Sequence, residues 1–391
     1  MKLVVIGLGQ CGGRVADQFE RLNKKARSLR GLDIITSTVA INTDVADLSG
    51  LTAIKSDYQH RILIGSRKTG GHGVGKINEL GAEIAKEDAD KVIDTVRNTK
   101  NFTDSDAFLL TAGAAGGTGS GSIAVMTQQL KERYVDKPVY NLLVLPFEHE
   151  ETTEDRTIYN VATCLKSSYL MADAVFLVDN QRYASKDTSV IGNLHKINSL
   201  IVEPFYNLLS AGEEKKHQYI GAKMLDAGDI IQTLVGWTTL GYGSSHSTFL
   251  GSFFKGNRDF RNKATETQRG IQAMDEAITG LSLKCNPLDS KRALYLISAS
   301  SKDINVDLVK ELGSYLKNIA SEAIIRSGDY PREKGSLDVT VVLSELSDVE
   351  KVRNYFTKAI SLITALKRRQ EGIVSTQRGI DITIKDIPSL L

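Results

Sequence analysis

Short apolar runs alternate with amphipathic stretches along the first 180 residues of the chain. The runs rich in β-branched residues are predicted as strands at 2–6, 34–41, 61–64, 107–111, 139–145 and 174–178. Between them, apolar residues recur at helical spacing near 13–30, 76–98, 120–134 and 157–170. Strands that are almost continuously apolar and alternate with helices predict a parallel sheet covered on both faces. Such sheets bind ligands at the carboxyl ends of their strands.

The second half of the chain mixes strands and helices in a different order. A stripe of Ile and Leu predicts a helix at about 189–211, which Pro204 should kink or end. Residues 213–217 are expected to form a charged, exposed loop, and residues 241–246 a glycine-rich turn. Further helices are predicted at 264–280, 304–325 and 347–370, with strands at 292–298 and 337–343.

These elements predict an α/β fold with three parts. Residues 1–212 are expected to form a Rossmann-like α/β domain that includes the central helix. Residues 213–345 form a smaller α+β domain, and residues 346–391 a C-terminal helix and tail.

Composition excludes several classes of protein. The chain has 391 residues, of which 41% are hydrophobic and 25% charged, as is ordinary for globular proteins. A formal net charge of +2 does not favour binding to nucleic acid, and no apolar run has the length of a transmembrane helix. The cysteines Cys11, Cys164 and Cys285 are far apart and lack metal-site spacing, which indicates reduced thiols in a cytoplasmic protein.

Residues 113–121 read GAAGGTGSG, and they join an apolar strand to a helix. Backbone amides at a helix N-terminus bind anions, and the helix dipole adds to the attraction. The glycines would allow close approach of a ligand and positive φ angles. Thr118 and Ser120 could cap the helix or donate hydroxyl hydrogen bonds. A glycine-rich turn without a ligand is the alternative, and it is disfavoured because glycines are costly in chain entropy.

Two more glycine-rich loops are expected at the same edge of the sheet. Residues 7–13 (GLGQCGG) fit the GxGxxG pattern of dinucleotide-binding folds, with Asp44 rather late for the expected acid. Residues 69–76 (TGGHGVGK) nearly fit a P-loop, but Ile77 replaces its Ser or Thr. Lys76 is therefore interpreted as an ordinary helix-surface lysine. Three such loops together indicate one ligand that carries several phosphates.

The motifs taken together resemble those of the tubulin/FtsZ superfamily. GAAGGTGSG resembles the tubulin signature GGGTG(S/T)G, and residues 9–12 (GQCG) resemble the GQxG loop. Residues 40–44 (AINTD) resemble the NTD loop of FtsZ, and residues 72–85 are most similar to the archaeal CetZ branch. The resemblance extends from residue 1 to about 240, and more loosely to about 345. Ala114 and Ala115 stand where glycine is usual, so a positive φ there would be strained.

The resemblance implies a site for GTP or GDP, with Mg²⁺ held largely by the nucleotide and no metal site made by the protein alone. The phosphates would lie against Gly9, Gln10, Cys11, Gly12, Gly113, Ala114, Ala115, Gly116, Gly117, Thr118 and Gly119. Asn42, Thr43 and Asp44 would lie near the magnesium and the γ-phosphate. The backbone amides of Gly70 and Gly71 would contact the γ-phosphate.

The resemblance also implies how the nucleoside is held. Asn180 and Asn198 match the two asparagines that read guanine, and Arg156 matches the family's arginine. An amide both donates and accepts hydrogen bonds, so two of them can accept guanine and reject adenine. The acidic loop 149–155 leaves open which of Glu150, Glu151 and Glu154 contacts the ribose.

Hydrolysis in this superfamily uses acids from the next subunit, and here these would be Asp226 and Asp229 in the segment LDAGDII. Their spacing places both carboxylates on one edge of a helix start. Taken alone, Asp229 equally fits an acid favoured by the helix dipole. Met224 replaces an asparagine of the FtsZ pattern. A front-to-back contact between identical chains that does not close into a ring produces a filament.

The sequence therefore predicts a tubulin-like GTPase that polymerises with itself into cytoskeletal filaments, with a role in cell shape. The alternatives are an FtsZ-like cell-division filament, a nucleotide-binding regulator that does not assemble, and an NAD-dependent oxidoreductase that uses Gly7–Gly12. Residues 373–391 are a candidate docking segment for a membrane adaptor or another cytoskeletal protein.

Overall fold

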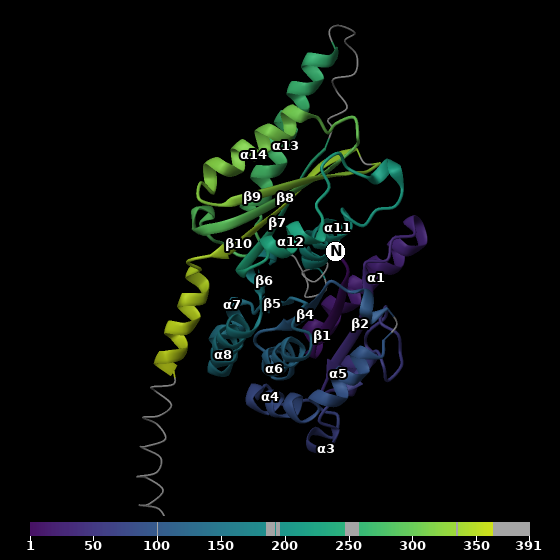
Figure 1. Ribbon diagram of the computed structural model, residues 1–391. Coiled ribbons are helices and arrows are strands. Elements are labelled where there is room, and N and C mark those ends of the chain that lie inside the picture. The colour runs from purple at the N-terminus through teal and green to yellow at the C-terminus, as the bar shows by residue number, and fades with distance from the viewer. Residues whose placement is uncertain (100, 185–191, 193–195, 247–257, 334, 363–391) are drawn as a thin grey trace, which may run out of the picture.

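The computed structural model describes the chain except for residues 100, 185–191, 193–195, 247–257, 334 and 363–391 (Figure 1). Within the described residues, ten strands form one sheet in the order β3-β2-β1-β4-β5-β6-β7-β10-β8-β9. The strands are β1 (Leu3–Leu8), β2 (Ile35–Asn42), β3 (Arg61–Leu63), β4 (Ala107–Gly113), β5 (Val139–Leu145), β6 (Ala174–Asp179), β7 (Gly236–His246), β8 (Ser290–Ala299), β9 (Ile324–Pro331) and β10 (Ser336–Leu346).

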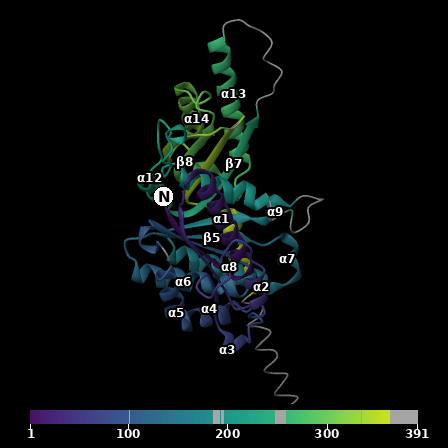
Figure 2. The ribbon, with the colours of Figure 1, turned by 90° about the vertical axis from the view of Figure 1, so that its right-hand side faces the viewer.

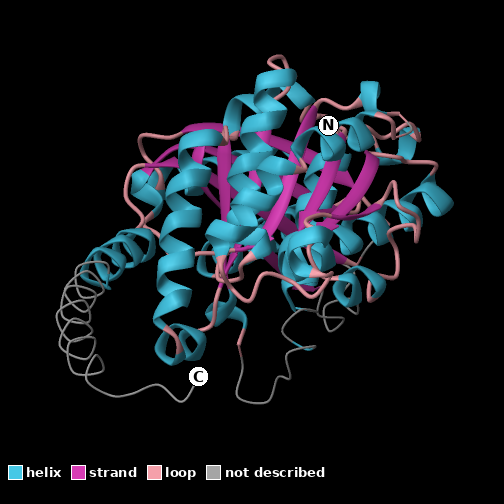
Figure 3. Ribbon diagram, turned by 90° about the horizontal axis from the view of Figure 1, so that it is seen from below, coloured by secondary structure: helices cyan, strands magenta, loops and turns pink. Residues whose placement is uncertain are grey.

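Strands β1 to β6 are parallel, as the sequence predicts, and helices cover both of their faces (Figure 3). Their order is that of a dinucleotide-binding fold, so topology alone does not exclude the oxidoreductase alternative. The helices of this half are α1 (Gly9–Arg30), α2 (Val45–Ser49), α3 (Ser66–Thr69), α4 (Asn78–Glu87), α5 (Ala89–Arg97), α6 (Thr118–Arg133), α7 (Glu148–Thr153), α8 (Asp155–Met171) and α9 (Asn180–Tyr183).

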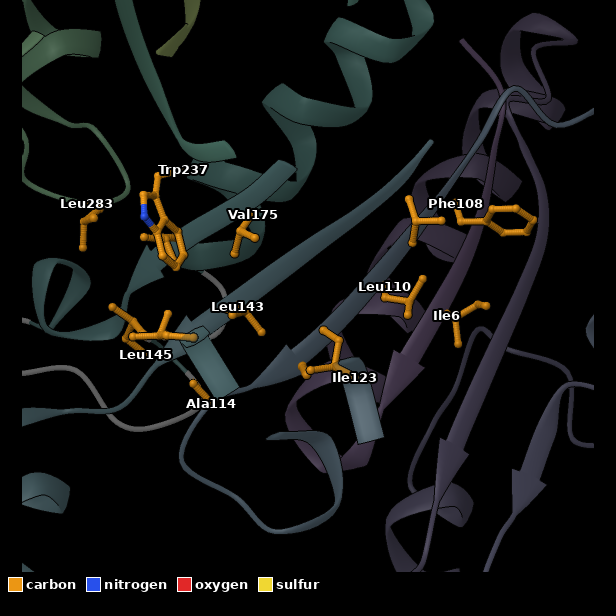
Figure 4. Packing of buried hydrophobic residues seen from close by; sticks show 14 of the residues in the cluster. Ile6, Phe108, Leu110, Ala114, Ile123, Leu143, Leu145, Val175, Trp237 and Leu283 are labelled. Atoms are coloured by element: carbon orange, nitrogen blue, oxygen red, sulfur yellow. The ribbon is translucent and has the colours of Figure 1, made fainter. Parts of the chain in front are cut away.

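The core explains why these strands carry apolar residues on both faces. Alternate side chains of a strand point to opposite faces, and each face of this sheet has its own buried cluster. In β1, Ile6 belongs to the cluster that also holds Phe108 and Leu110 of β4, which Figure 4 shows from close by. The neighbouring residues Val5 of β1 and Leu109 of β4 belong to the cluster under α1. Both faces of the sheet are therefore covered by apolar side chains, so polar and apolar positions do not alternate regularly along these strands.

The second half continues the sheet and changes its direction. The start of β7 pairs with β6 in parallel, β10 is antiparallel to β7 and β8, and β9 is parallel to β8. Helices α13 (Arg258–Thr279) and α14 (Val306–Ile319) pack together beside these strands (Figures 1 and 2). This arrangement confirms the predicted smaller α+β part.

Two predictions for this half are wrong. Residues 241–246 are the second half of β7 and not a turn. A Cβ on Gly241 or Gly243 would lie 2.0 Å from the carbonyl oxygen of Ala277 or Ala273, so glycine allows α13 to lie directly on the strand. The helix predicted at 304–325 ends at Ile319, and its last residues open β9.

The central helix contains an irregular segment before Pro204. Residues Asn198–Val202 have π-helical hydrogen bonding, and α11 (Glu203–Ser210) follows with Pro204 in its first turn. Proline has no N–H and its ring clashes with the carbonyl four residues earlier, so a change of hydrogen-bond register here is expected. The helix is altered at this point but does not end.

The loop at 213–217 is not uniformly exposed, contrary to prediction. Glu214 is buried and forms an ion pair with Arg30 at the end of α1. It also accepts a 2.6 Å hydrogen bond from the Tyr330 hydroxyl on β9. This cluster joins the half that contains β1 to β6 to the α+β half.

The last described helix covers residues 350–362, within the predicted 347–370. Lys351 forms a 2.7 Å ion pair with Asp179 at the end of β6, so this helix packs back on the first half. The rest of the predicted helix and the candidate docking segment 373–391 lie outside the described residues. No described helix is long and apolar enough to cross a membrane.

We predict that Gly243→Ala destabilises the protein by about 1–3 kcal/mol, because the added methyl group overlaps the backbone of α13. Gly335→Ala is the matched control, because no atom of the described residues lies within 4 Å of its new methyl group, and the change should stay within about 0.5 kcal/mol. Urea unfolding of both variants measures the difference. Equal stabilities would contradict the packing described here.

Candidate functional site

A cavity of about 300 Å³ lies at the carboxyl ends of the parallel strands. The glycine-rich loops meet there as the sequence predicts. Its walls are formed by Leu8, Gly9, Gln10, Cys11, Asn42, Asp44, Asp47, Gly73, Lys76, Gly113, Ala115, Gly116, Gly117, Thr118, Gly119, Val144, Leu145, Pro146, Glu150 and Asn180.

The loop 113–117 forms the floor of the cavity and opens α6. A Cβ at Gly116 would meet no atom of the described residues within 4 Å, so this residue faces open space. A Cβ at Gly119 would lie 2.7 Å from the Leu8 carbonyl oxygen, so this glycine is needed for backbone packing. The N-cap residue Gly117 supplies no side-chain hydrogen bond to α6. The first-turn amides of this 16-residue helix therefore remain available to an anion.

The backbone conformation differs from expectation in this loop. None of Gly113, Gly116, Gly117 and Gly119 has a positive φ, whereas Gly9, Gly70, Gly71, Gly73 and Gly75 do. Ala114 and Ala115 also have ordinary φ angles, so alanine is accommodated there without strain. The Thr118 hydroxyl lies 2.6 Å from that of Thr43, which joins the loops after β4 and β2.

The loop after β1 packs against the same floor. A Cβ at Gly9 would lie 2.9 Å from the amide nitrogen of Gly119, and a Cβ at Gly12 would lie 2.0 Å from the Thr111 carbonyl oxygen. Gly12 does not line the cavity, and its role is to bring α1 onto β4. Burial raises the pKa of the Cys11 thiol to about 11, so it is a neutral lining group.

Asp47 is a cavity residue that the motif analysis did not identify. Its two carboxylate oxygens accept hydrogen bonds from Gln10 Nε2 at 2.7 Å and Asn42 Nδ2 at 3.0 Å. Asp44 caps α2 by accepting from the amides of Ala46 and Asp47. The sequence signal was present, since Asp47 lies in the first turn of the helix that Asp44 starts. The described residues contain no group of three or more candidate metal ligands.

The loop 69–77 departs from prediction at Lys76. This residue precedes α4, lines the cavity and has a left-handed φ of 62°, so its interpretation as an ordinary helix-surface lysine is wrong. Gly70 and Gly71 do not line the cavity, although the Gly71 carbonyl accepts from Val45 N at 3.0 Å and fixes the loop beside α2.

The predicted base-reading residues lie on different elements. Asn180 follows β6, starts α9 and lines the cavity. Asn198 lies in the π-helical segment outside the lining, and its buried Oδ1 has no hydrogen-bond partner among the described residues. Arg156 on α8 also lies outside the lining, where it forms an ion pair with Glu79 and stacks 5.0 Å from the Tyr159 ring.

Residues 149–155 are mostly helical, in α7 and the start of α8, and are not a loop. Of the three acids left open by the sequence, Glu150 lines the cavity. Glu151 is buried and accepts from Tyr355 and Lys358 on the helix 350–362. Glu154 forms a 2.5 Å ion pair with Lys76.

Asp226 and Asp229 lie at the other edge of the sheet. They belong to the start of α12 (Ala227–Thr233), whose chain continues into β7, and Gly236 N donates to the Asp173 carbonyl just before β6. This is the amino-terminal edge, whereas the cavity is at the carboxyl edge. Asp226 Oδ1 accepts from Asp229 N at 2.7 Å, and Asp229 Oδ1 accepts from Arg326 Nε at 3.0 Å.

Comparison with known proteins agrees with this geometry. Residues 2–186 match the Tubulin/FtsZ family GTPase domain, and residues 187–361 match the tubulin-like CetZ C-terminal domain. The tubulin-like protein CetZ1 of Haloferax volcanii is 32% identical over 92% of each chain. The tubulin-like protein CetZ of Pyrococcus abyssi is 28% identical over 97% of this chain and 93% of its own length.

Two solved structures share the whole fold. The GDP-bound monomer of CetZ1 from Haloferax volcanii has a TM-score of 0.78 at 30% identity, covering 93% of this chain and 99% of its own. The GTPγS-bound protofilament of CetZ2 from the same organism has a TM-score of 0.79 at 29% identity, covering 94% and 100%. The chain belongs to the tubulin-like CetZ family of the tubulin/FtsZ superfamily.

Proposed function

We propose that this chain is a GTPase that binds GTP in the cavity and polymerises head-to-tail, hydrolysing GTP where two chains meet. The observation that carries the proposal is the separation of its two functional groups of residues. The cavity lies at the carboxyl edge of the sheet, and the candidate acids lie at the amino-terminal edge. One chain cannot bring both to the same nucleotide, but a second copy stacked front to back can.

The phosphates would bind to the amides of the loops that form the cavity floor. Gly116 faces open space, and the first turn of α6 adds its free amides and its dipole. Asp44 and Asp47 line this part of the cavity from the N-cap and the first turn of α2, where carboxylates fit a hydrated Mg²⁺. When bound, Mg²⁺ would neutralise phosphate charge, and most of its ligands would come from the nucleotide and water.

The nucleoside would extend toward β6 and the central helix. The amide of Asn180 is at the cavity, and the buried Oδ1 of Asn198 is an acceptor that has no hydrogen-bond partner among the described residues. Guanine offers N–H donors on its recognition edge, and an acceptor left unpaired in a buried place favours such a ligand. Glu150, as the acid in the cavity wall, is the candidate ribose contact.

Catalysis would consist of positioning and electrostatic stabilisation at the contact between chains. Asp226 and Asp229 of one chain would orient the attacking water at the terminal phosphate held by the next. Arg326 holds one oxygen of Asp229, and the Asp229 amide holds one oxygen of Asp226. The carboxylates therefore have fixed positions before the chains meet.

The CetZ-type C-terminal domain favours a cytoskeletal filament that acts on cell shape over an FtsZ-like division filament. The GTPγS-bound protofilament of CetZ2 supports assembly of this chain with itself. The three cysteines form no disulfide bond, which is consistent with a protein that functions in the reducing cytoplasm. A membrane adaptor or another cytoskeletal protein as a partner of residues 373–391 stays a prediction.

We predict that Asp226→Asn lowers GTP turnover by roughly 10- to 100-fold and leaves GTP affinity unchanged. Asparagine caps a helix as well as aspartate, so the start of α12 is preserved while the charge is lost. Asp307→Asn is the matched control, because Asp307 is an exposed acid in the first turn of α14. Steady-state phosphate release and nucleotide titration measure the two effects. Unchanged turnover in Asp226→Asn would remove the acid from the mechanism.

We also predict that two impaired variants recover turnover when they are mixed. Gly116→Glu would place a carboxylate in the open space of the cavity and block phosphate binding, while its own Asp226 stays intact. Asp226→Asn keeps the cavity but lacks the acid. At a junction where Gly116→Glu supplies its acids to the cavity of Asp226→Asn, both parts of the site are intact. Phosphate release from the mixture should exceed the sum of the separate variants, and a simple sum would indicate that each chain acts alone.

A further inference from the structure

The charge of the cavity wall is unusual for a site that receives a polyanion. Among the described residues that line it, Lys76 is the one Lys or Arg, whereas Asp44, Asp47 and Glu150 all contribute carboxylates. Magnesium can offset the carboxylates that face the phosphates. The position of this single basic side chain therefore affects which part of a bound ligand the cavity can recognise.

The backbone of Lys76 is held in place from several sides. Its φ of 62° is left-handed, which is unfavourable for a lysine and persists only where neighbours enforce it. Asn160, which is fully buried on α8, donates from Nδ2 to the carbonyl of Lys76 at 2.9 Å. The same nitrogen lies 3.0 Å and 3.1 Å from the carbonyls of Ala115 and Gly116. Asn160 thus fixes Lys76 beside the floor of the cavity.

The ammonium group of Lys76 is held more weakly than its backbone. It forms a 2.5 Å ion pair with Glu154, and the two side chains are 42% and 46% exposed. Ion pairs this exposed contribute little to stability, because water screens both charges. The flexible four-carbon chain lets the ammonium change partners while the backbone stays fixed.

We propose that the Lys76 ammonium leaves Glu154 and binds the terminal phosphate of GTP, which makes Lys76 the side chain that distinguishes a nucleoside triphosphate from a diphosphate. The inference rests on the proposed function, since it needs GTP in this cavity. A terminal phosphate carries more negative charge and more acceptor oxygens than one carboxylate, so it attracts the ammonium more strongly than Glu154 does. The exchange also separates the loop 69–77 from the start of α8, where Glu154 lies, when the third phosphate is present.

The competing interpretation is that the Lys76–Glu154 pair only fastens the loop to α8. In that case, loss of the ion pair would loosen the whole cavity and weaken the binding of both nucleotides equally. A phosphate contact would weaken the triphosphate selectively. The ratio of the two dissociation constants therefore separates the interpretations.

The test measures Kd for GTPγS and for GDP at protein concentrations at which no material pellets. Lys76→Met keeps the chain length and the same backbone strain but removes the charge. We expect Kd for GTPγS to rise roughly tenfold or more and Kd for GDP to change less than about twofold. Lys76→Arg should recover most of the preference for GTPγS.

Two further variants serve as controls. Lys68→Met removes a lysine that pairs with Glu83 and Glu87 on α4 and lies outside the cavity lining, and it should change neither Kd. The double variant Lys76→Met/Glu154→Gln removes the unpaired carboxylate that Lys76→Met leaves behind. It should still lose the preference for GTPγS, whereas Glu154→Gln alone should keep or increase it.

The outcomes separate this inference from the proposed function. Equal weakening of GTPγS and GDP in Lys76→Met, or recovery of the preference in the double variant, would overturn the role of Lys76. Failure of the unaltered protein to bind either nucleotide would instead overturn the proposed function itself.

Discussion

The site depends on close packing between the backbones of the two glycine-containing loops that follow β1 and β4. Gly119 lies against the Leu8 carbonyl, Gly9 against the Gly119 amide, and Gly12 against the Thr111 carbonyl, at distances that leave no room for a Cβ. Packed cores do not deform continuously, so a single added methyl group here would move a whole loop. The small residues of the sequence GAAGGTGSG are therefore needed for packing within the protein itself. The open space at Gly116, which the packing creates, is what remains for a ligand.

Two charge arrangements follow from this geometry, one at each edge of the sheet. At the carboxyl edge, Gln10 and Asn42 hold Asp47 by hydrogen bonds, and Lys76 forms an ion pair with Glu154. At the amino-terminal edge, Asp226 and Asp229 are held by a helix amide and by Arg326. Under the proposed function, the first edge would hold the phosphates and the second would supply the acids that orient water, so neither would act alone. Assembly of identical chains would complete both at once, which links filament formation to turnover.

Much of this could be predicted from sequence, for reasons that particular residues make clear. Strands β1 to β6 were predictable because both of their faces are buried, and the phosphate loops because glycines cluster between strand and helix. The second half of strand β7 was missed because glycines are typical of turns. Here Gly241 and Gly243 instead allow α13 to pack directly on the strand. The cavity position of Lys76 was missed because its left-handed backbone depends on Asn160, 84 residues away. Long-range contacts of this kind leave no local pattern in a sequence.

The most direct test of the shared site is GTP turnover per chain across a range of protein concentrations, with sedimentation of the same samples. If acids of one chain complete the cavity of the next, turnover per chain rises with concentration and follows the amount of pelleted protein. Turnover per chain that is constant with concentration, in samples where nothing pellets, would show that each chain contains its own complete site. That result would contradict the account of the two edges given above.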